Sequence, residues 1–235
     1  MIVFEDVSYA YETGRPVLDG VRLELSAGLV LLLGPNGCGK STLLKLASGV
    51  EKPDSGSVLV DGKDLWREEI EARHRIAYLP EHPDLTPYAT VEEVAGLVCR
   101  MRGKSLDEGR RALDFFGLQG AACNTVRELS LGQRRRAVFA GVLIGAPEHI
   151  LLDEPLAGMD RAIKPRILEW ILAQVERGAL VVVVSHNIEP FRDSAARLVT
   201  VRGGEALSFG EMPADPAERL ALIDRLAQGK APEAP

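Results

Sequence analysis

The sequence has few cysteines, no excess of basic residues and no long apolar run, and each of these shortages excludes a class of protein. Its three cysteines, Cys38, Cys99 and Cys123, are an odd number without the spacing of metal ligands, so neither a disulfide framework nor a zinc site is predicted. The formal net charge of −6 argues against a general nucleic-acid coat or a polybasic membrane binder, and we expect no nucleic-acid partner. The longest uncharged stretches, such as residues 26–39, are shorter than the roughly 18 apolar residues of a membrane span.

A secretory signal and low-complexity sequence are also lacking. Residues 1–12 carry early acidic residues and no basic n-region, which indicates a reduced, cytoplasmic compartment. Glycine and proline, with 23 and 14 residues of 235, are too few for a low-complexity chain. Apolar residues make up 46% and charged residues 26%, the balance of a soluble protein that can bury the core of one large or two small domains.

An aliphatic run, a glycine-rich turn and a helical segment follow one another early in the chain. Residues 21–33 first alternate and then, after a turn at residues 27–28, run unbroken through aliphatic side chains. This pattern predicts a half-exposed strand followed by a strand that is buried on both faces. The sequence GPNGCG at residues 34–39 comes next, and helical spacing begins at residue 40, so the order is strand, turn, helix.

Further strands and a helical insertion are indicated along the rest of the chain. Two aliphatic runs, residues 149–152 and 180–184, end in polar residues, and a third, residues 198–201, enters a hairpin. Buried strands with polar carboxyl ends, separated by helical stretches, predict a mostly parallel α/β sheet that binds its ligand at those ends. The charged, Leu- and Ala-rich segment from about residue 91 to 146 predicts a helical insertion between the two halves of the sheet.

The glycine-rich turn matches the phosphate-binding pattern G-x-x-x-x-G-K-[ST] in the strand–turn–helix context that this pattern requires. Its glycines let backbone N–H groups converge on phosphate oxygens, and the positive end of the following helix adds to the attraction. We expect Lys40 to reach the β- and γ-phosphates and the Ser41 hydroxyl to bind Mg²⁺. The residues predicted to hold the phosphates are Gly34, Pro35, Asn36, Gly37, Cys38, Gly39, Lys40, Ser41 and Thr42.

Two strand ends carry the candidate catalytic groups. Asp153 and Glu154 close a buried strand, where adjacent carboxylates are costly without a cation nearby. We assign Asp153 to the Mg²⁺ shell and Glu154 to the attacking water as its polarising base, although an acidic strand end taken alone is equally typical of a cap. His186 follows another strand at the same sheet edge, where an imidazole can hydrogen-bond a γ-phosphate. With Lys40, these groups predict a Mg²⁺-dependent nucleoside-triphosphate hydrolase. The remaining histidines are predicted to lie at the surface: His74, His82 and His149.

The segment LSLGQ at residues 129–133 opens a helix that continues RRRAVFAGVL, about twenty residues before Asp153. Taken alone, Ser130 is the N-cap of this helix and the three arginines at residues 134–136 form a solvated face. The order of the motifs along the chain favours a functional interpretation of the same residues instead.

In chain order, the motifs GPNGCGKST, LSLGQ, HILLDEP, LAGMD and VVVVSHN resemble those of the nucleotide-binding subunit of ATP-binding cassette (ABC) transporters. The resemblance spans residues 4 to about 210. It implies an α/β fold, in which a P-loop NTPase core with a mostly parallel sheet carries an N-terminal antiparallel β part and a helical ABC insertion subdomain. It further implies a single ABC ATPase domain over residues 1–212 with the helical subdomain at about 85–146, followed at 213–235 by a short helix, expected at 216–227, and a frayed tail.

The resemblance also implies roles for single residues. Tyr11 lies where the family stacks an aromatic side chain on adenine. Glu81 lies in the loop that normally carries a glutamine, which touches Mg²⁺ and senses the γ-phosphate. His186 is the switch histidine, and Asp160 belongs to a loop that communicates across a dimer. Three residues of LSLGQ are implied to contact the ATP held by the other subunit: Ser130, Gly132 and Gln133.

One phosphate loop and one LSLGQ segment cannot complete a site within a single chain. The family's geometry implies that two ATP molecules, with Mg²⁺, are sandwiched between head-to-tail subunits of a homo- or heterodimer. ATP would favour the closed pair, hydrolysis would open it, and the helical insertion would pass this motion to an integral membrane permease. The chain is therefore expected to be peripheral on the cytoplasmic face of a cell membrane.

Two residues depart from the family pattern. Leu131 stands at the first glycine of the family's LSGGQ, and since Ser130 and Gly132 remain, we expect phosphate contact with altered packing across the dimer. Glu81 stands at the glutamine. Its carboxylate can bind Mg²⁺, which favours hard oxygen ligands, but it lacks an amide N–H and adds negative charge near phosphate. We predict an active but slower ATPase.

The type of transporter stays open at this point. Residues 77–103 resemble the branch that exports drugs, polysaccharides and lipids, whereas residues 7–21 and 132–160 look more like importers that use energy-coupling modules. A soluble ABC-type ATPase, such as a cluster-assembly ATPase, is the alternative outside transport. A P-loop kinase or GTPase would need neither LSLGQ nor His186.

Overall fold

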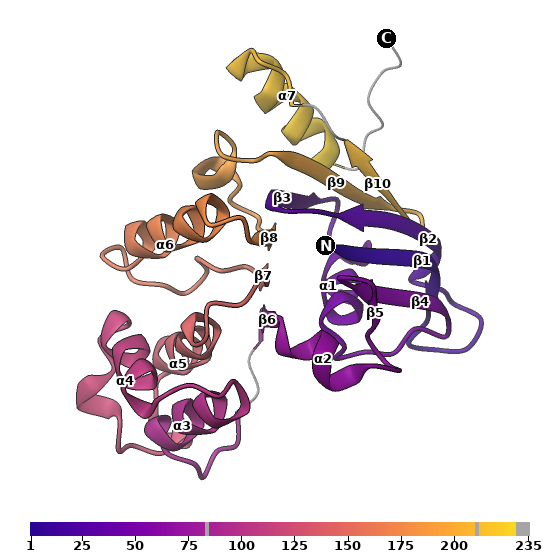
Figure 1. Ribbon diagram of the computed structural model, residues 1–235. Coiled ribbons are helices and arrows are strands. Elements are labelled where there is room, and N and C mark those ends of the chain that lie inside the picture. The colour runs from indigo at the N-terminus through magenta and orange to yellow at the C-terminus, as the bar shows by residue number, and fades with distance from the viewer. Residues whose placement is uncertain (83–84, 210–211, 229–235) are drawn as a thin grey trace.

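Two sheets with different strand pairing organise the chain. In the computed structural model, which describes residues 1–82, 85–209 and 212–228, a four-stranded antiparallel sheet has the order β2-β1-β4-β5, and a six-stranded sheet has the order β10-β9-β3-β8-β7-β6 (Figure 1). The six-stranded sheet is parallel except for the hairpin strand β10. The strand bounds are β1 Ile2–Tyr9, β2 Leu18–Leu25, β3 Gly28–Leu33, β4 Ser55–Val60, β5 Lys63–Asp64, β6 Ile76–Leu79, β7 His149–Asp153, β8 Leu180–Val184, β9 Arg197–Arg202 and β10 Glu205–Phe209. The predicted α/β class, with a mostly parallel sheet and an N-terminal antiparallel part, is confirmed.

The central strands β3, β7 and β8 are buried on both faces because alternate side chains enter two different cores. In β3, Leu29 and Leu31 pack with the helices on one face of the sheet. Val30 and Leu32 pack on the other face, in a core that is shared with the antiparallel sheet. Full burial of one such aliphatic side chain contributes roughly 1.5–3 kcal/mol, so an unbroken aliphatic run is favoured in strands of this kind.

Helix α1 (Lys40–Ser48) lies between the two sheets, and most other helices lie on the far face of the parallel sheet (Figure 1). Leu43, Leu44 and Leu46 of α1 are buried in the core that joins the sheets. The other helices are α2 Glu69–His74, α3 Val91–Met101, α4 Leu106–Phe115, α5 Leu131–Leu143, α6 Lys164–Glu176 and α7 Pro216–Ala227, with 3₁₀ turns at Gln119–Ala121, Val126–Glu128 and Glu189–Phe191.

The predicted helical insertion contains α3, α4 and α5, which lie between β6 and β7 in the chain and at one end of the molecule (Figure 1). Each helix begins at a side-chain cap. The Thr90 hydroxyl accepts from the N–H of Glu93 in α3, and the hydroxyls of Ser105 and Ser130 accept from the N–H three residues later in α4 and α5. Such caps satisfy N–H groups that have no partner inside the helix and stabilise it by about 1 kcal/mol each. The helices pack on one another, which holds the start of α5 in a defined place.

Two expectations about the ends of elements have different outcomes. Helix α7 has the predicted bounds, Pro216–Ala227, while the last part of the predicted tail, residues 229–235, lies outside the described residues. The prediction that His149 lies at the surface is wrong: it opens β7, and only 4% of it is exposed. Its Nε2 lies 2.8 Å from Oδ2 of Asp61, so a distant partner compensates the burial. None of the described helices has both the length and the apolar character needed to span a membrane.

Candidate functional site

The loop between β3 and α1 is shaped by glycines with positive φ. Gly34 has φ 138°, and a Cβ there would lie 2.6 Å from the backbone oxygen of Val201, so only glycine fits. Gly39, with φ 112°, is the N-cap of α1 and supplies no side-chain hydrogen bond to the helix. The first N–H groups of α1 are therefore left for another acceptor, and the positive end of the helix favours an anionic one.

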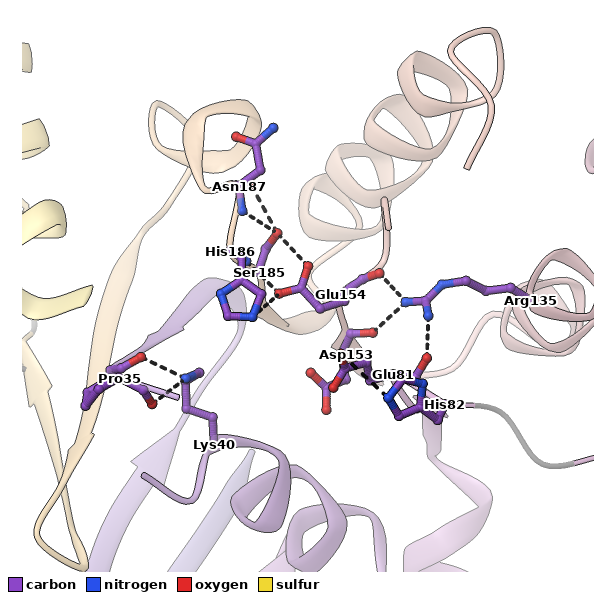
Figure 2. A network of polar contacts seen from close by, with 11 residues as sticks. Pro35, Lys40, Glu81, His82, Arg135, Asp153, Glu154, Ser185, His186 and Asn187 are labelled. Atoms are coloured by element: carbon purple, nitrogen blue, oxygen red, sulfur yellow. Dashed lines mark hydrogen bonds and ion pairs between the residues drawn. The ribbon is translucent and has the colours of Figure 1, made fainter. Parts of the chain in front are cut away.

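Lys40 lies across this loop (Figure 2). Its Nζ donates to the carbonyl oxygens of Gly34 at 2.7 Å and Pro35 at 2.9 Å. Carbonyl oxygens are weaker acceptors for an ammonium group than ionised phosphate oxygens are. The ammonium group is thus held at the loop by bonds that an anionic ligand can replace.

Asp153 and Glu154, at the carboxyl end of β7, are both buried carboxylates with 2% and 7% exposure. Burial raises the pKa of Asp153, and a hydrogen bond from Ser41 partly opposes the shift. Burial also raises the pKa of Glu154, against the hydrogen bond that it accepts from the backbone of His186. Such raised values in a cleft are typical of carboxylates that bind a cation or accept a proton.

Glu154 has an unusual backbone that its neighbours hold in place. Its φ is 53°, in the left-handed region that non-glycine residues rarely adopt. Its carboxylate accepts from the N–H of His186 at 2.6 Å and from the hydroxyl of Ser185 at 3.3 Å (Figure 2). The His186 ring is 67% exposed, with Nε2 3.8 Å from Oε1 of Glu154. The end of β8 therefore orients the carboxylate at the end of β7.

These groups share one cavity of about 520 Å³, within the usual range of ligand pockets. Eleven of the residues proposed for the site line it: Tyr11, Asn36, Gly37, Gly39, Lys40, Ser41, Thr42, Glu81, Asp153, Glu154 and His186. Cys38 lines a neighbouring cavity of about 540 Å³, which shares Tyr11 and Gly37 with the first. Burial raises the pKa of the Cys38 thiol.

Tyr11 stands at the junction of these two cavities. The residue is 53% exposed, and its ring meets the Tyr9 ring edge-on, with 5.0 Å between the ring centroids. Its hydroxyl lies 3.3 Å from Oγ1 of Thr42, and Lys45 donates to it over 3.3 Å. The hydroxyl end is thus anchored on α1, and the ring presents an aromatic surface beside the loop between β3 and α1.

Ser130, Gly132 and Gln133 are not among the residues that line the cavity. Ser130 is the N-cap of α5, as local sequence reasoning predicts: its hydroxyl accepts from the N–H of Gln133, whose side chain accepts from the N–H of Ser130. Leu131 beside it is 79% exposed. Asp160 is also exposed and pairs with Arg136 at 3.4 Å. The structure therefore brings most of the residues predicted to hold phosphate into one cavity, which Gly34, Pro35 and Cys38 do not line, and it leaves the start of α5 facing outward.

Sequence reasoning missed Arg135. Taken alone, the segment predicts that the arginines at 134–136 form a solvated face and gives Arg135 no role, but only 8% of this residue is exposed. It donates to the backbone oxygens of Glu81, Asp153 and Glu154 (Figure 2). A signal was available, because Arg135 precedes the buried Phe139 by four residues and so shares the buried face of α5.

Comparisons with known proteins agree with this geometry. The sequence model of the ABC transporter family matches residues 18–157. The energy-coupling factor transporter ATP-binding protein EcfA of Methanothermobacter thermautotrophicus is 32% identical over 219 residues, covering 89% of this chain and 70% of that protein. The Nod factor export ATP-binding protein I of Burkholderia thailandensis is 31% identical over 214 residues, which cover 89% of this chain and 70% of that protein. A dimeric ATP-binding cassette in a post-hydrolysis state, bound to ADP and Pi, superposes with a TM-score of 0.79 at 25% identity, covering 89% of this chain and 98% of that one.

Proposed function

The chain belongs to the ABC transporter family as an ATP-binding subunit that hydrolyses ATP, and from this premise we propose that it closes with a second ABC subunit around two Mg²⁺–ATP and drives a separate membrane permease. The observation that carries this proposal is the split of the site. Lys40, Glu154 and His186 line the cavity, whereas Ser130 is exposed elsewhere. A second subunit that offers its own Ser130 would complete the phosphate shell.

The donor set of the cavity fits Mg²⁺. The Ser41 hydroxyl and the carboxylates of Glu81 and Asp153 line the same cavity, and all are the hard oxygen ligands that this ion prefers. Asp153 is a carboxylate with 2% exposure, and burying its charge is costly unless a cation compensates it. When bound, the ion supplies positive charge to the phosphate oxygens.

We assign each remaining role from position and charge. Lys40 exchanges the carbonyl oxygens of its own loop for phosphate oxygens, which are stronger acceptors for an ammonium group. Glu154 orients the attacking water and accepts its proton, a role that the raised pKa favours because burial makes the carboxylate a stronger base. The exposed imidazole of His186 stands beside it, where it can donate to the γ-phosphate. Tyr11 offers its ring to the adenine.

The relatives' names support a transport role but do not agree on direction. One is named for energy-coupling factor transport, one for Nod factor export and a third for spermidine and putrescine import. We therefore propose a permease partner without assigning its substrate. Glu81, which lines the cavity in place of a glutamine, is proposed to permit hydrolysis at a reduced rate.

Purification of the chain with whatever it binds tests this proposal. The tagged full chain is isolated from gently solubilised native membranes, and its partners are identified by mass spectrometry, with the soluble fraction of the same cells as the control. We expect a multi-span permease in stoichiometric amount in the membrane sample. Only soluble partners, with the chain absent from the membranes, would refute the transport role and favour a soluble ABC-type ATPase.

A further inference from the structure

We propose that Arg135 is a positioning residue for ATP hydrolysis: from the start of α5 it holds the backbone of the Glu81 loop and of the Asp153–Glu154 strand end in register. The inference rests on the proposed roles of those carboxylates, and it adds a residue that does not itself line the cavity. Three observations carry it, namely the choice of acceptors, the depth of burial and the backbone of Glu154.

The first observation is where the guanidinium group donates. Its Nη1 donates to the oxygen of Glu81, and its Nη2 donates to the oxygens of Asp153, at 3.1 Å, and Glu154 (Figure 2). Each acceptor belongs to a residue whose carboxylate lines the cavity. Glu81 follows β6 and Asp153 ends β7, so one side chain fixes the relative position of two loops that are 72 residues apart in the chain.

The second observation is that Arg135 is buried and, within the part of the chain that the structure describes, hydrogen-bonds to no carboxylate. Only 8% of it is exposed, and its Nε makes no hydrogen bond among the described residues. Burial lowers the pKa of Arg135, which the nearby charges of Glu154, Glu81 and Asp153 oppose. A charged side chain that is buried is most often paired with an opposite charge. Arg135 instead donates from its planar guanidinium group to backbone carbonyl oxygens. A lysine ammonium group cannot reproduce this geometry.

The third observation is the left-handed backbone of Glu154, which persists only where its surroundings hold it. Its N–H donates to the oxygen of Val184 at 2.8 Å, and its oxygen accepts from Arg135. The two bonds hold the peptide groups on either side of the residue. Loss of the Arg135 bond lets Glu154 relax toward an ordinary backbone conformation, which moves the carboxylate away from its place in the cavity.

The position of Arg135 also connects the two halves of the split site. It lies in the second turn of α5, five residues after Ser130, which begins the same helix. Because α-helices are stiff over this length, a displacement of Ser130 reaches the three carbonyl groups through Arg135. The carboxylates are thereby tied to the segment that is proposed to meet the second ATP.

Substitution at residue 135 with a neighbouring control tests the proposal. Arg134 is the matched control, since it lies on the same helix, carries the same charge and donates to the oxygens of Leu129 and Arg127, which lie outside the cavity. The full-length variants R135Q, R135K and R134Q are compared with the wild type. For each we measure kcat, KM, the thermal midpoint and the affinity for a fluorescent ATP analogue in EDTA, where no turnover occurs.

We expect R135Q to lower kcat by about 10–100-fold, the usual effect of losing a residue that positions functional side chains without contacting the ligand. Its affinity for the ATP analogue should stay within a few-fold of the wild-type value. R135K retains the positive charge but lacks the planar guanidinium donors, so we expect its kcat to lie between those of R135Q and the wild type. R134Q keeps the wild-type kcat. Should R135Q not be recovered folded, R135K against R134Q gives the same comparison.

Two results would overturn the proposal. One is an equal loss of kcat in R134Q, because charge on α5 would then explain the effect. The other is a loss in R135K that appears equally in analogue affinity and thermal midpoint, because Arg135 would then be merely structural. Failure of the proposed catalytic function is separately visible, since Glu154→Gln would then hydrolyse ATP as fast as the wild type.

Discussion

Carboxyl groups lie at both ends of β7, but their surroundings shift their pKa values in opposite directions. At the amino end, His149 and Arg75 pair with Asp61 at 2.8 and 3.2 Å. Burial alone would raise the pKa of Asp61, but hydrogen bonds from the Met1 amino group and His149 lower it to about 2. At the carboxyl end, burial raises the pKa of Asp153 and Glu154.

The difference separates a structural cluster from a functional one. Opposite charges compensate burial at the amino end, so its ionised groups stabilise the fold. At the carboxyl end, the cation beneath the carboxylates, Arg135, bonds only to backbone oxygens of the site residues. The carboxylates themselves are proposed to serve a metal ion and a reacting water, since raised pKa values in a cleft are typical of functional carboxylates. Substitutions at the two ends should therefore affect different properties.

The largest effect is expected from Glu154→Gln at the carboxyl end. The amide keeps the size of the side chain but cannot accept a proton, so kcat should fall by roughly 10²–10⁴-fold while ATP affinity is retained. Single-turnover and steady-state phosphate release measure the loss. Turnover within a few-fold of the wild type would remove Glu154 from the reaction and weaken the contrast between the two ends.

The two histidines offer a matched pair, one at each end. His186→Ala removes a proposed phosphate donor, and we expect kcat to fall by about 10²-fold with an unchanged thermal midpoint. His149→Asn should leave kcat unchanged and lower the free energy of unfolding by about 1–3 kcal/mol, because the buried His149 ring and its bond to Asp61 are lost. Phosphate release measures kcat, and urea unfolding measures stability. Loss of stability in His186→Ala together with loss of kcat in His149→Asn would contradict the proposed difference between the two ends.

Asp61 gives the amino end a pH signature. Because its folded pKa of about 2 is below the usual value of 3.8 for an aspartate, its stabilisation is present above about pH 4 and is lost as the pH falls toward 2. Asp61→Asn should cost no more than about 1 kcal/mol at pH 7, because solvent screens the charges around this exposed residue, and it should make unfolding less acid-dependent between pH 4 and 2. Urea unfolding across this range measures both. The same acid dependence in the variant and the wild type would show that Asp61 is not the titrating group.

The smallest effect is expected from Glu81→Gln. It removes one negative charge from the cavity and restores an amide that can orient water, so kcat should rise by less than about tenfold, the equivalent of one hydrogen bond. Steady-state turnover at saturating Mg²⁺–ATP measures it. A fall in kcat would instead give the carboxylate a positive role.

The sequence predicts what depends on local pattern. The β3–loop–α1 unit, β7, β8 and α7 follow from periodicity, glycine placement and caps, all of which act over a few residues. Burial of Arg135 and His149 depends on partners far away in the chain: Glu81 is 54 residues from Arg135, and Asp61 is 88 from His149. The left-handed backbone of Glu154 likewise needs the fold around it. Local pattern carries no record of such pairings.

The most direct test of the central claim is the mass of Glu154→Gln in solution, with and without Mg²⁺–ATP, measured by sedimentation. Slow turnover should trap the closed state, so we predict a shift from the 25.5 kDa monomer to twice that mass with ATP. Ser130→Arg in the same background, which blocks the segment proposed to meet the second ATP, should abolish the shift. A chain that stays at 25.5 kDa while saturated with ATP would contradict closure between two copies of this chain and leave only a different ABC subunit as the partner.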